Sequence, residues 1–195
     1  MIGRFGPPSW PTVLLTLCSW NALLAVLLGK DMNWDLLNYH FYNGYALLTG
    51  RLERDLAPAQ VQTFFNPLMD VPLYLAIVYL PPVVVGAVYG FVQGLNGVAV
   101  WLIGRETLPI EDRRRREWTA LGLAVLGGLG AINIGELGGG MGDTLVSIPV
   151  LFAVAVLLRS RQRLETGSIV AVAGWAALAG AITGVGAGLK LTSGI

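Results

Sequence analysis

The sequence predicts an all-α, polytopic integral membrane protein with about five transmembrane helices and with interfacial helices in its first outer loop. The first observation is composition: 54% of the 195 residues are hydrophobic and only 13% are charged, whereas soluble domains carry about 25% charged residues. The second is the alternation of long apolar runs with short segments rich in arginine or glycine. We expect residues 1–195 to form a single transmembrane domain.

Five apolar segments approach the roughly 20 residues that a helix needs to cross a bilayer. They are residues 11–29, 83–104, 118–134, 144–158 and 168–189. A sixth apolar segment, 68–80, is shorter and stops at Pro81 and Pro82. Proline removes a backbone donor and clashes with the preceding turn. We therefore interpret 68–80 as an interfacial or re-entrant helix and not as a crossing.

The arginines predict the orientation, because short loops rich in Lys and Arg stay in the cytoplasm. Loops 105–117 and 159–166 carry most of the arginines, and Arg4 marks the N-terminus as cytoplasmic. The two arginine-rich loops and the N-terminus lie on the same side of the bilayer only if segment 68–80 does not cross it. The segments that this leaves on the extracytoplasmic side of a multi-pass protein of the cell membrane are 30–82 and 135–143.

Several classes of protein are disfavoured by the charge pattern. The net charge is +1, which gives no electrostatic basis for binding nucleic acid. The spans hold amides but almost no charge, which disfavours an ion-coupled transporter. Cys18 is the only cysteine, so no internal disulfide forms. Because the chain stops shortly after Lys190, we expect it to be the N-terminal part of a longer protein.

Glycine recurs at every fourth residue in two of the spans, a spacing that predicts close helix packing. The positions are Gly86, Gly90 and Gly94 in one span and Gly180, Gly184 and Gly188 in another.

The first outer loop opens with a predicted interfacial helix over residues 34–50, which Gly50 ends. Its apolar stripe consists of Leu37, Phe41, Tyr45 and Leu48. Its polar side is formed largely by Asp35, Asn38, Tyr39 and Tyr42. Tyrosine and tryptophan favour the headgroup level of a membrane, so the helix is expected to lie along the surface.

Three carboxylates in this loop are candidates for chemistry. Asp35 lies near the helix N-terminus, where the dipole favours an acid, and it is either a helix-terminal acid or a catalytic base. Asp31 competes for the catalytic role because it lies closer to the end of the first span. Asp70 either begins the next helix or belongs to the site.

His40 and Arg51 are the other polar candidates of the first loop. His40 is the only histidine, so a packed or hydrogen-bonded role is favoured over a metal site. Arg51 belongs to a run of alternating charges, which is typical of a solvated surface, although it could also meet a phosphate.

The second outer loop reads GELGGGMGD and ends at Asp143. Its glycines let backbone N–H groups approach a ligand, but the GK[ST] pattern of a nucleotide phosphate loop does not follow them. Asp143 is either the start of the next helix or a site residue, and Glu136 can end the previous helix. Lys190 follows the last span and either snorkels to the interface or holds a lipid phosphate.

The order of these motifs resembles the GT-C class of membrane glycosyltransferases, such as protein O-mannosyltransferases and bacterial lipid A aminoarabinose transferases. WDLLNYHFYNGYALLTGR resembles the acidic opening of their large outer loop, with Asp35 on the first acid and Leu36 where a second acid stands in the family. NPLMDVPLYLAIVYLPP resembles their juxtamembrane helix. GELGGGMGDTL resembles their second outer loop, whose acid falls on Asp143, and GAGLKLT resembles a later Gly-Lys-Thr segment.

The resemblance implies an enzyme that transfers a sugar, with inversion, from a polyprenyl-phosphate carrier to an acceptor on the extracytoplasmic side. Asp35 would be the catalytic base. The expected substrate contacts are Asp31, Tyr39, His40, Arg51, Asp143 and Lys190. We expect membrane lipid as a partner and no cofactor. A divalent metal is left open, although Leu36 stands where the second acid of a metal-binding pair would be. The alternative is a non-catalytic transporter or a subunit for polysaccharide assembly.

Overall fold

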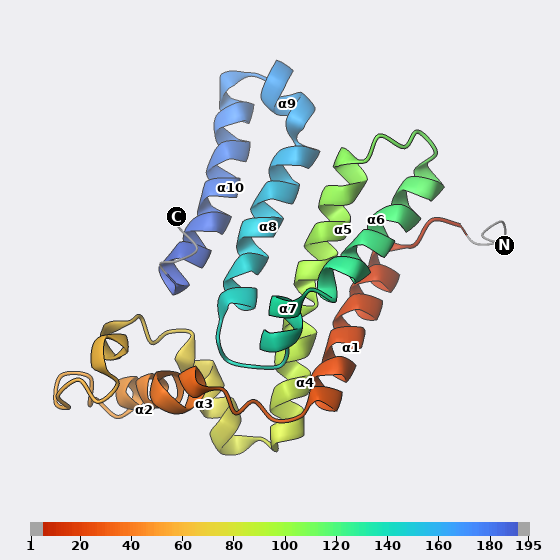
Figure 1. The fold of residues 1–195 in the computed structure, drawn as a ribbon. Coiled ribbons are helices and arrows are strands. Elements are labelled where there is room, and N and C mark those ends of the chain that lie inside the picture. The colour runs from red at the N-terminus through yellow and green to blue at the C-terminus, as the bar shows by residue number, and fades with distance from the viewer. Residues whose placement is uncertain (1–5, 191–195) are drawn as a thin grey trace.

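The computed structural model describes residues 6–190, and this part of the chain contains helices and no strand. The long helices run side by side in Figure 1. They are α1 (Trp10–Leu28), α4 (Pro82–Gln93), α5 (Leu95–Thr107), α6 (Arg113–Gly128), α8 (Asp143–Arg159) and α10 (Ile169–Leu189). The short ones are η2 (Leu36–His40, a π-helix), α2 (Phe41–Leu48), η3 (Gln60–Phe64, a 3₁₀-helix), α3 (Asp70–Tyr79), α7 (Ala131–Glu136) and α9 (Arg161–Thr166).

Three helices of the described part are long and apolar enough to cross a membrane: α1, the continuous α4–α5 unit Pro82–Thr107, and α10. The structure therefore supports a membrane protein built from helices. Helices α6 and α8 have 16 and 17 residues and are shorter than these. The segment 118–134, predicted as one span, is divided, because α6 ends at Gly128 and α7 starts at Ala131. Asn133 stabilises this break by donating through Nδ2 to the Gly128 carbonyl at 2.7 Å.

Helix α4 packs closely on α1 through glycine, as its four-residue spacing predicts. A Cβ atom on Gly94 would lie 2.5 Å from Cα of Cys18, and one on Gly90 would lie 2.7 Å from Cβ of Ala25. The second set behaves differently. A Cβ on Gly180, Gly184 or Gly188 would meet no described atom within 4 Å, so this stripe on α10 is not a packing face in the described structure.

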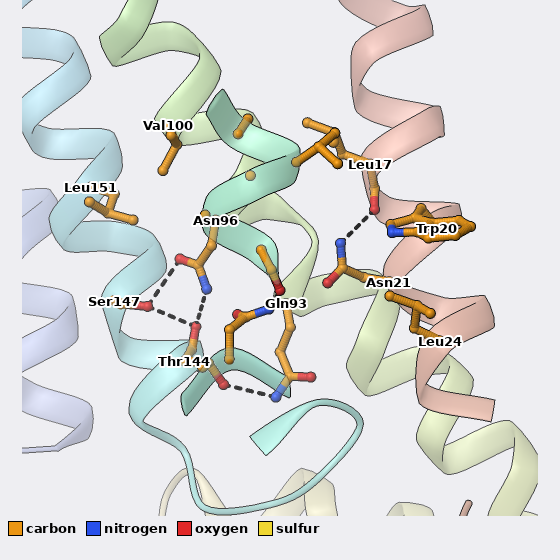
Figure 2. A pocket seen from close by; sticks show the side chains of 16 residues that line it. Leu17, Trp20, Asn21, Leu24, Gln93, Asn96, Val100, Thr144, Ser147 and Leu151 are labelled. Carbon is orange, nitrogen blue, oxygen red and sulfur yellow. Dashed lines mark hydrogen bonds between the residues drawn. The ribbon is translucent and has the colours of Figure 1, made fainter. Parts of the chain in front are cut away.

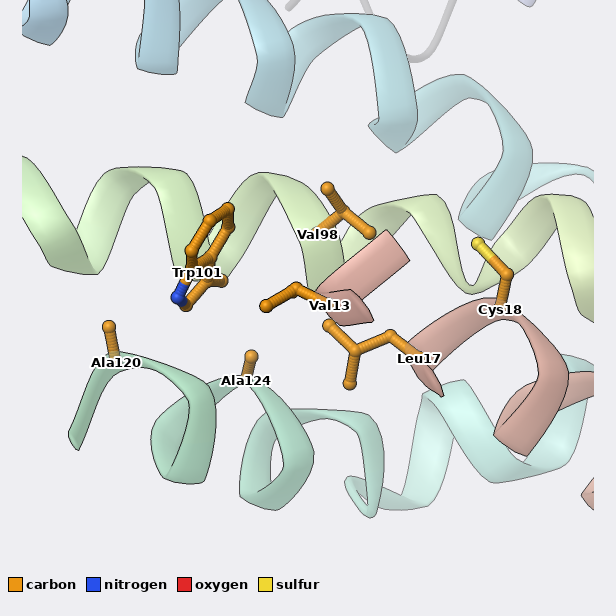
Figure 3. Packing of buried hydrophobic residues seen from close by; sticks show 7 residues of the cluster. All are labelled: Val13, Leu17, Cys18, Val98, Trp101, Ala120 and Ala124. Atoms are coloured by element: carbon orange, nitrogen blue, oxygen red, sulfur yellow. The ribbon is translucent and has the colours of Figure 1, made fainter. Parts of the chain in front are cut away.

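A hydrophobic cluster joins α1, α5 and α6 away from the outer loops (Figure 3). Trp101 is 1% exposed and belongs to this cluster together with the small residues Ala120 and Ala124 of α6. Beside it the guanidinium of Arg105 lies over the Trp101 ring and pairs with the buried Glu117 at 2.9 Å. This ion pair ties α5 to α6 where the arginine-rich connection begins.

The connections separate to the two ends of the bundle (Figure 1). The α5–α6 connection and α9, which carry most of the arginines, lie at the same end as the first described residues. Helices α2 and α3 and the loop between α7 and α8 lie at the opposite end, where α2 and α3 run across the bundle. Helix α3 ends at Tyr79, just before Pro81, as the proline pair predicts.

The glycine contacts give a matched test of packing. Gly94→Ala should destabilise the protein, because overpacking costs on the order of 1–3 kcal/mol. Gly184→Ala should be neutral or slightly stabilising, because its Cβ meets nothing and alanine favours helix by about 1 kcal/mol. Thermal unfolding of both variants in detergent checks the difference, and equal melting temperatures would contradict the α1–α4 contact.

Cysteine labelling tests the separation of the loops across a membrane. In a Cys18→Ser background, a cysteine replacing the exposed Thr49 should react with an impermeant maleimide from outside intact cells. A cysteine replacing the exposed Gln162 in α9 should react only after the cells are opened. Labelling of both from the same side would overturn the topology.

Candidate functional site

The first outer loop begins with a helix that is buried on one side. The helix expected over 34–50 is present as η2 followed by α2, and Gly50 ends it in the left-handed region at φ 66°. Tyr39, His40 and Asn43 are buried, whereas Leu37 of the predicted apolar stripe is 63% exposed. The π-helical turn widens the helix at Leu36–His40, a feature that is frequent at functional sites.

The phenol of Tyr39 is influenced by the charges of three carboxylates from different parts of the chain. Burial raises the pKa of Tyr39 to about 12, and the charges of Asp35, Asp70 and Asp143 add to the effect. Asp35 precedes η2, Asp70 begins α3, and Asp143 begins α8. At neutral pH the Tyr39 phenol is therefore a hydrogen-bond donor in an acidic surrounding.

His40 and Asp70 form a buried pair between η2 and α3. Nδ1 of His40 lies 2.6 Å from Oδ1 of Asp70, and the two residues are 5% and 4% exposed. The expectation that His40 is hydrogen-bonded is confirmed. Asp70 both begins α3 and holds His40, so the two roles that the sequence left open coincide.

A cavity of about 530 Å³ opens between the first loop and the end of α10. Tyr39, His40 and Asp70 line one side of it, and Lys190 lines the other. Its apolar walls are Phe64, Phe65, Met69, Ala187 and Leu189. Small-molecule sites have volumes of roughly 300–1,000 Å³, so this cavity is the principal candidate for binding.

Of the two basic side chains that the sequence predicts as substrate contacts, Lys190 lines this cavity and Arg51 does not. Its Nζ lies 2.6 Å from Oδ1 of Asp143 and donates to the carbonyl of Met141 at 2.9 Å. Asp143 is half-exposed. Lys190 and Asp143 are 47 residues apart in the sequence, so only the packing of α10 on α8 brings them together.

The carboxylate of Asp31 is bonded to groups of both outer loops. Its Oδ2 accepts from the backbone N–H of Gly140 at 2.8 Å, and its Oδ1 accepts from the backbone and side chain of Asn33. It joins the first outer loop to the second. A Cβ on Gly139 would lie 2.9 Å from the same Oδ2, so the glycine of this loop permits the approach of Asp31.

The glycine loop is also tied to the bundle by Gln93, which the sequence analysis did not single out. Gln93 Oε1 accepts from Gly138 N at 2.7 Å, and its Nε2 donates to the Glu136 carbonyl and to Thr144 Oγ1. Glu136 in turn accepts from Thr144 N, at the start of α8. The amides of Gly138 and Gly140 are thus already bonded within the protein. A buried glutamine in a span was the signal for this contact, because polar groups are costly there.

A second polar pocket, of about 230 Å³, lies in the bundle next to this network (Figure 2). Figure 2 shows Asn96 bonded to the Thr144 carbonyl and Ser147 bonded to Asn96. Asn21 donates to Leu17 of its own helix. Asn96 thus holds α5 against α8, whereas Asn21 is bonded within α1.

Arg51 is not brought to the cavity. It makes two hydrogen bonds of 2.8 Å to Asp55, which also accepts from the Tyr42 hydroxyl. These hydrogen bonds lower the pKa of Asp55, and the bond from Arg51 has the larger effect. Arg51 is half-exposed and belongs to the solvated surface that its alternating charges indicate.

Leu36, at the position of the family's second acid, is 5% exposed and packs with Leu73 and Val85. Among the described residues, no group of three or more His, Cys, Asp or Glu side chains could hold a metal ion. Comparison of the chain with models of protein families, with curated proteins and with solved structures found no match.

The link between the outer loops can be tested by hydrogen exchange. Asp31→Ala should speed exchange of the Gly140 amide at least tenfold, because a hydrogen bond to a charged group is worth about 1.5–3 kcal/mol. Asp35→Ala is the matched control, since Asp35 makes no hydrogen bond to a described residue and should leave that amide unchanged. Equal protection in both variants would show that Asp31 does not hold the loop.

Proposed function

We propose that this protein is a membrane glycosyltransferase of the GT-C type, which transfers a sugar with inversion from a polyprenyl-phosphate carrier to an acceptor on the extracytoplasmic side. One observation carries the proposal. The charges of three carboxylates act on Tyr39, which lines a cavity together with Lys190 at the end of the bundle opposite the arginine-rich loops. A carboxylate that accepts the proton of the acceptor hydroxyl and a cation that holds a phosphate are the groups that such a transfer needs.

The proposed topology has about five crossings. Helices α6 and α8 cross together with the three long helices, and α2 and α3 lie in the interface. This arrangement keeps the arginine-rich connections in the cytoplasm, as expected for short basic loops. It leaves the cavity and both outer loops on the extracytoplasmic face of the cell membrane.

The lipid part of the donor can lie against apolar surface near the first loop. A second groove of about 260 Å³ is lined mainly by apolar residues from η2, α2, α3 and α4, among them Leu36, Phe41 and Ile77. The exposed Leu37 also lines this groove. Lys190 is the proposed phosphate contact, in place of Arg51, because Lys190 lines the cavity of about 530 Å³ and Arg51 does not.

Asp35 is the proposed base. It is partly exposed and makes no hydrogen bond to a described residue, so its oxygens are open to an acceptor hydroxyl. The hydroxyl oxygen forms a bond to the anomeric carbon as the bond from that carbon to the phosphate oxygen breaks. The hydroxyl proton passes to Asp35, and polyprenyl phosphate leaves. Because a carboxylate is a weak base, positioning must supply much of the acceleration.

Replacing the base gives the decisive measurement. Asp35→Asn in the full-length protein should lower transfer about 10²–10⁴-fold, the usual range for general-base catalysis, without changing membrane insertion. Transfer is measured in proteoliposomes with a panel of radiolabelled polyprenyl-phosphate sugars.

Asp31→Asn is the matched control for this assay and should cause a much smaller loss, because Asp31 positions a loop. Full activity of Asp35→Asn would sink its assignment as base. No transfer from any donor by the unmodified protein would favour the non-catalytic alternative.

A further inference from the structure

The His40–Asp70 pair fixes which ring nitrogen of the histidine carries the proton. An ionised carboxylate only accepts hydrogen bonds, and Oδ1 of Asp70 lies 2.6 Å from Nδ1 of His40. Nδ1 is therefore the donor. In the neutral ring Nε2 then carries only a lone pair and is a hydrogen-bond acceptor.

This acceptor is unsatisfied. Nε2 of His40 is buried and has no hydrogen-bond partner among the described residues. Buried polar atoms in folded proteins are almost always paired, so an exception needs an explanation. The explanation here comes from the position of His40, which lines the cavity of about 530 Å³ together with Asp70.

The walls of this cavity suit a ligand that has a flat apolar face and polar groups at its edge. The rings of Tyr39 and His40 lie 4.1 Å apart, and Phe65 meets Tyr39 edge-on at 5.9 Å. Phe64 and Met69 extend the apolar lining. A pyranose ring has this character, with C–H groups for the aromatic walls and hydroxyls as hydrogen-bond donors.

We propose that the cavity binds a pyranose unit, one of whose hydroxyls donates a hydrogen bond to Nε2 of His40. Asp70 is a positioning residue that keeps Nε2 free of a proton. The choice of a sugar rests on the proposed function, whereas the need for a hydroxyl donor rests on the His40–Asp70 geometry. The same contact would serve a sugar on the lipid donor or on the acceptor.

The test reads the two ring nitrogens of His40, the only histidine of residues 1–195. With ¹⁵N-histidine and the full-length protein in nanodiscs, the signals of His40 are those that the His40→Asn variant lacks. We expect a protonated Nδ1 and an unprotonated Nε2. Octyl β-glucoside should shift the Nε2 resonance in a saturable manner, and octyl phosphate should not.

Two outcomes would overturn the proposal directly. One is a proton on Nε2 in the neutral ring. The other is no saturable shift with the glucoside, whether or not octyl phosphate produces one, because this would assign Nε2 to water or to an anion. A polyprenyl-phosphate glucose that competes with the octyl glucoside would identify the donor sugar as the occupant, and failure to compete would identify the acceptor sugar.

Substitutions separate the contact from the fold. His40→Asn retains a side-chain N–H for Asp70 but has no atom at the position of Nε2, and should weaken binding of radiolabelled octyl glucoside at least tenfold. His40→Gln can place an amide oxygen near that position and should restore part of the affinity. Comparable thermal unfolding would show that both variants fold, and unchanged affinity in His40→Asn would reject the contact.

Asp70→Asn tests positioning, because the amide can donate to Nδ1 and release the tautomer. The ¹⁵N signals should then show a proton on Nε2, and glucoside affinity should fall. An unchanged tautomer would reject the role of Asp70. Glucoside binding without transfer from any polyprenyl-phosphate sugar would leave this inference standing and overturn the proposed function.

Discussion

The glycine loop between α7 and α8 is the constraint on which the outer end of the molecule depends. Two of its backbone amides are bonded to side chains from elsewhere in the chain, Gly138 to Gln93 and Gly140 to Asp31. These bonds fix where α8 begins, and with it Asp143. Because Lys190 also binds the Met141 carbonyl, the end of α10 is set by the same loop.

The reason for this dense bonding is the cost of unpaired polar groups in the protein interior, where residues 137–140 are buried. The loop departs from helical structure, so its amides and carbonyls need other partners. Gln93, Asp31, Glu136 and Lys190 provide them. Nε2 of His40 stays unpaired within the described structure, as do side-chain atoms of Asn38, Asn43 and Gln62 in the first loop. Of these four residues only His40 lines the cavity of about 530 Å³.

Sequence patterns predicted the helices but not which of their faces are buried. The spacing of Leu37 and Phe41 correctly indicated a helix, but both of its sides meet neighbours: Phe41 contacts Tyr74 of α3, and Tyr39 contacts Phe65. The two glycine stripes have the same spacing, but only the one on α4 packs against a described helix. A periodic pattern defines a face, and the neighbouring elements decide what covers it.

By itself, the sequence determined an all-helical membrane protein, the end of α3 before its prolines, and the separation of the arginine-rich loops from segments 30–82 and 135–143. These follow from local physics: hydrophobic length, backbone restriction by proline, and charge. Only the tertiary structure decided that Asp31 holds a loop, that Arg51 stays with Asp55, and that His40 pairs with Asp70. Such pairings join residues that are distant in sequence, or select one neighbour among several, and no local pattern encodes that choice.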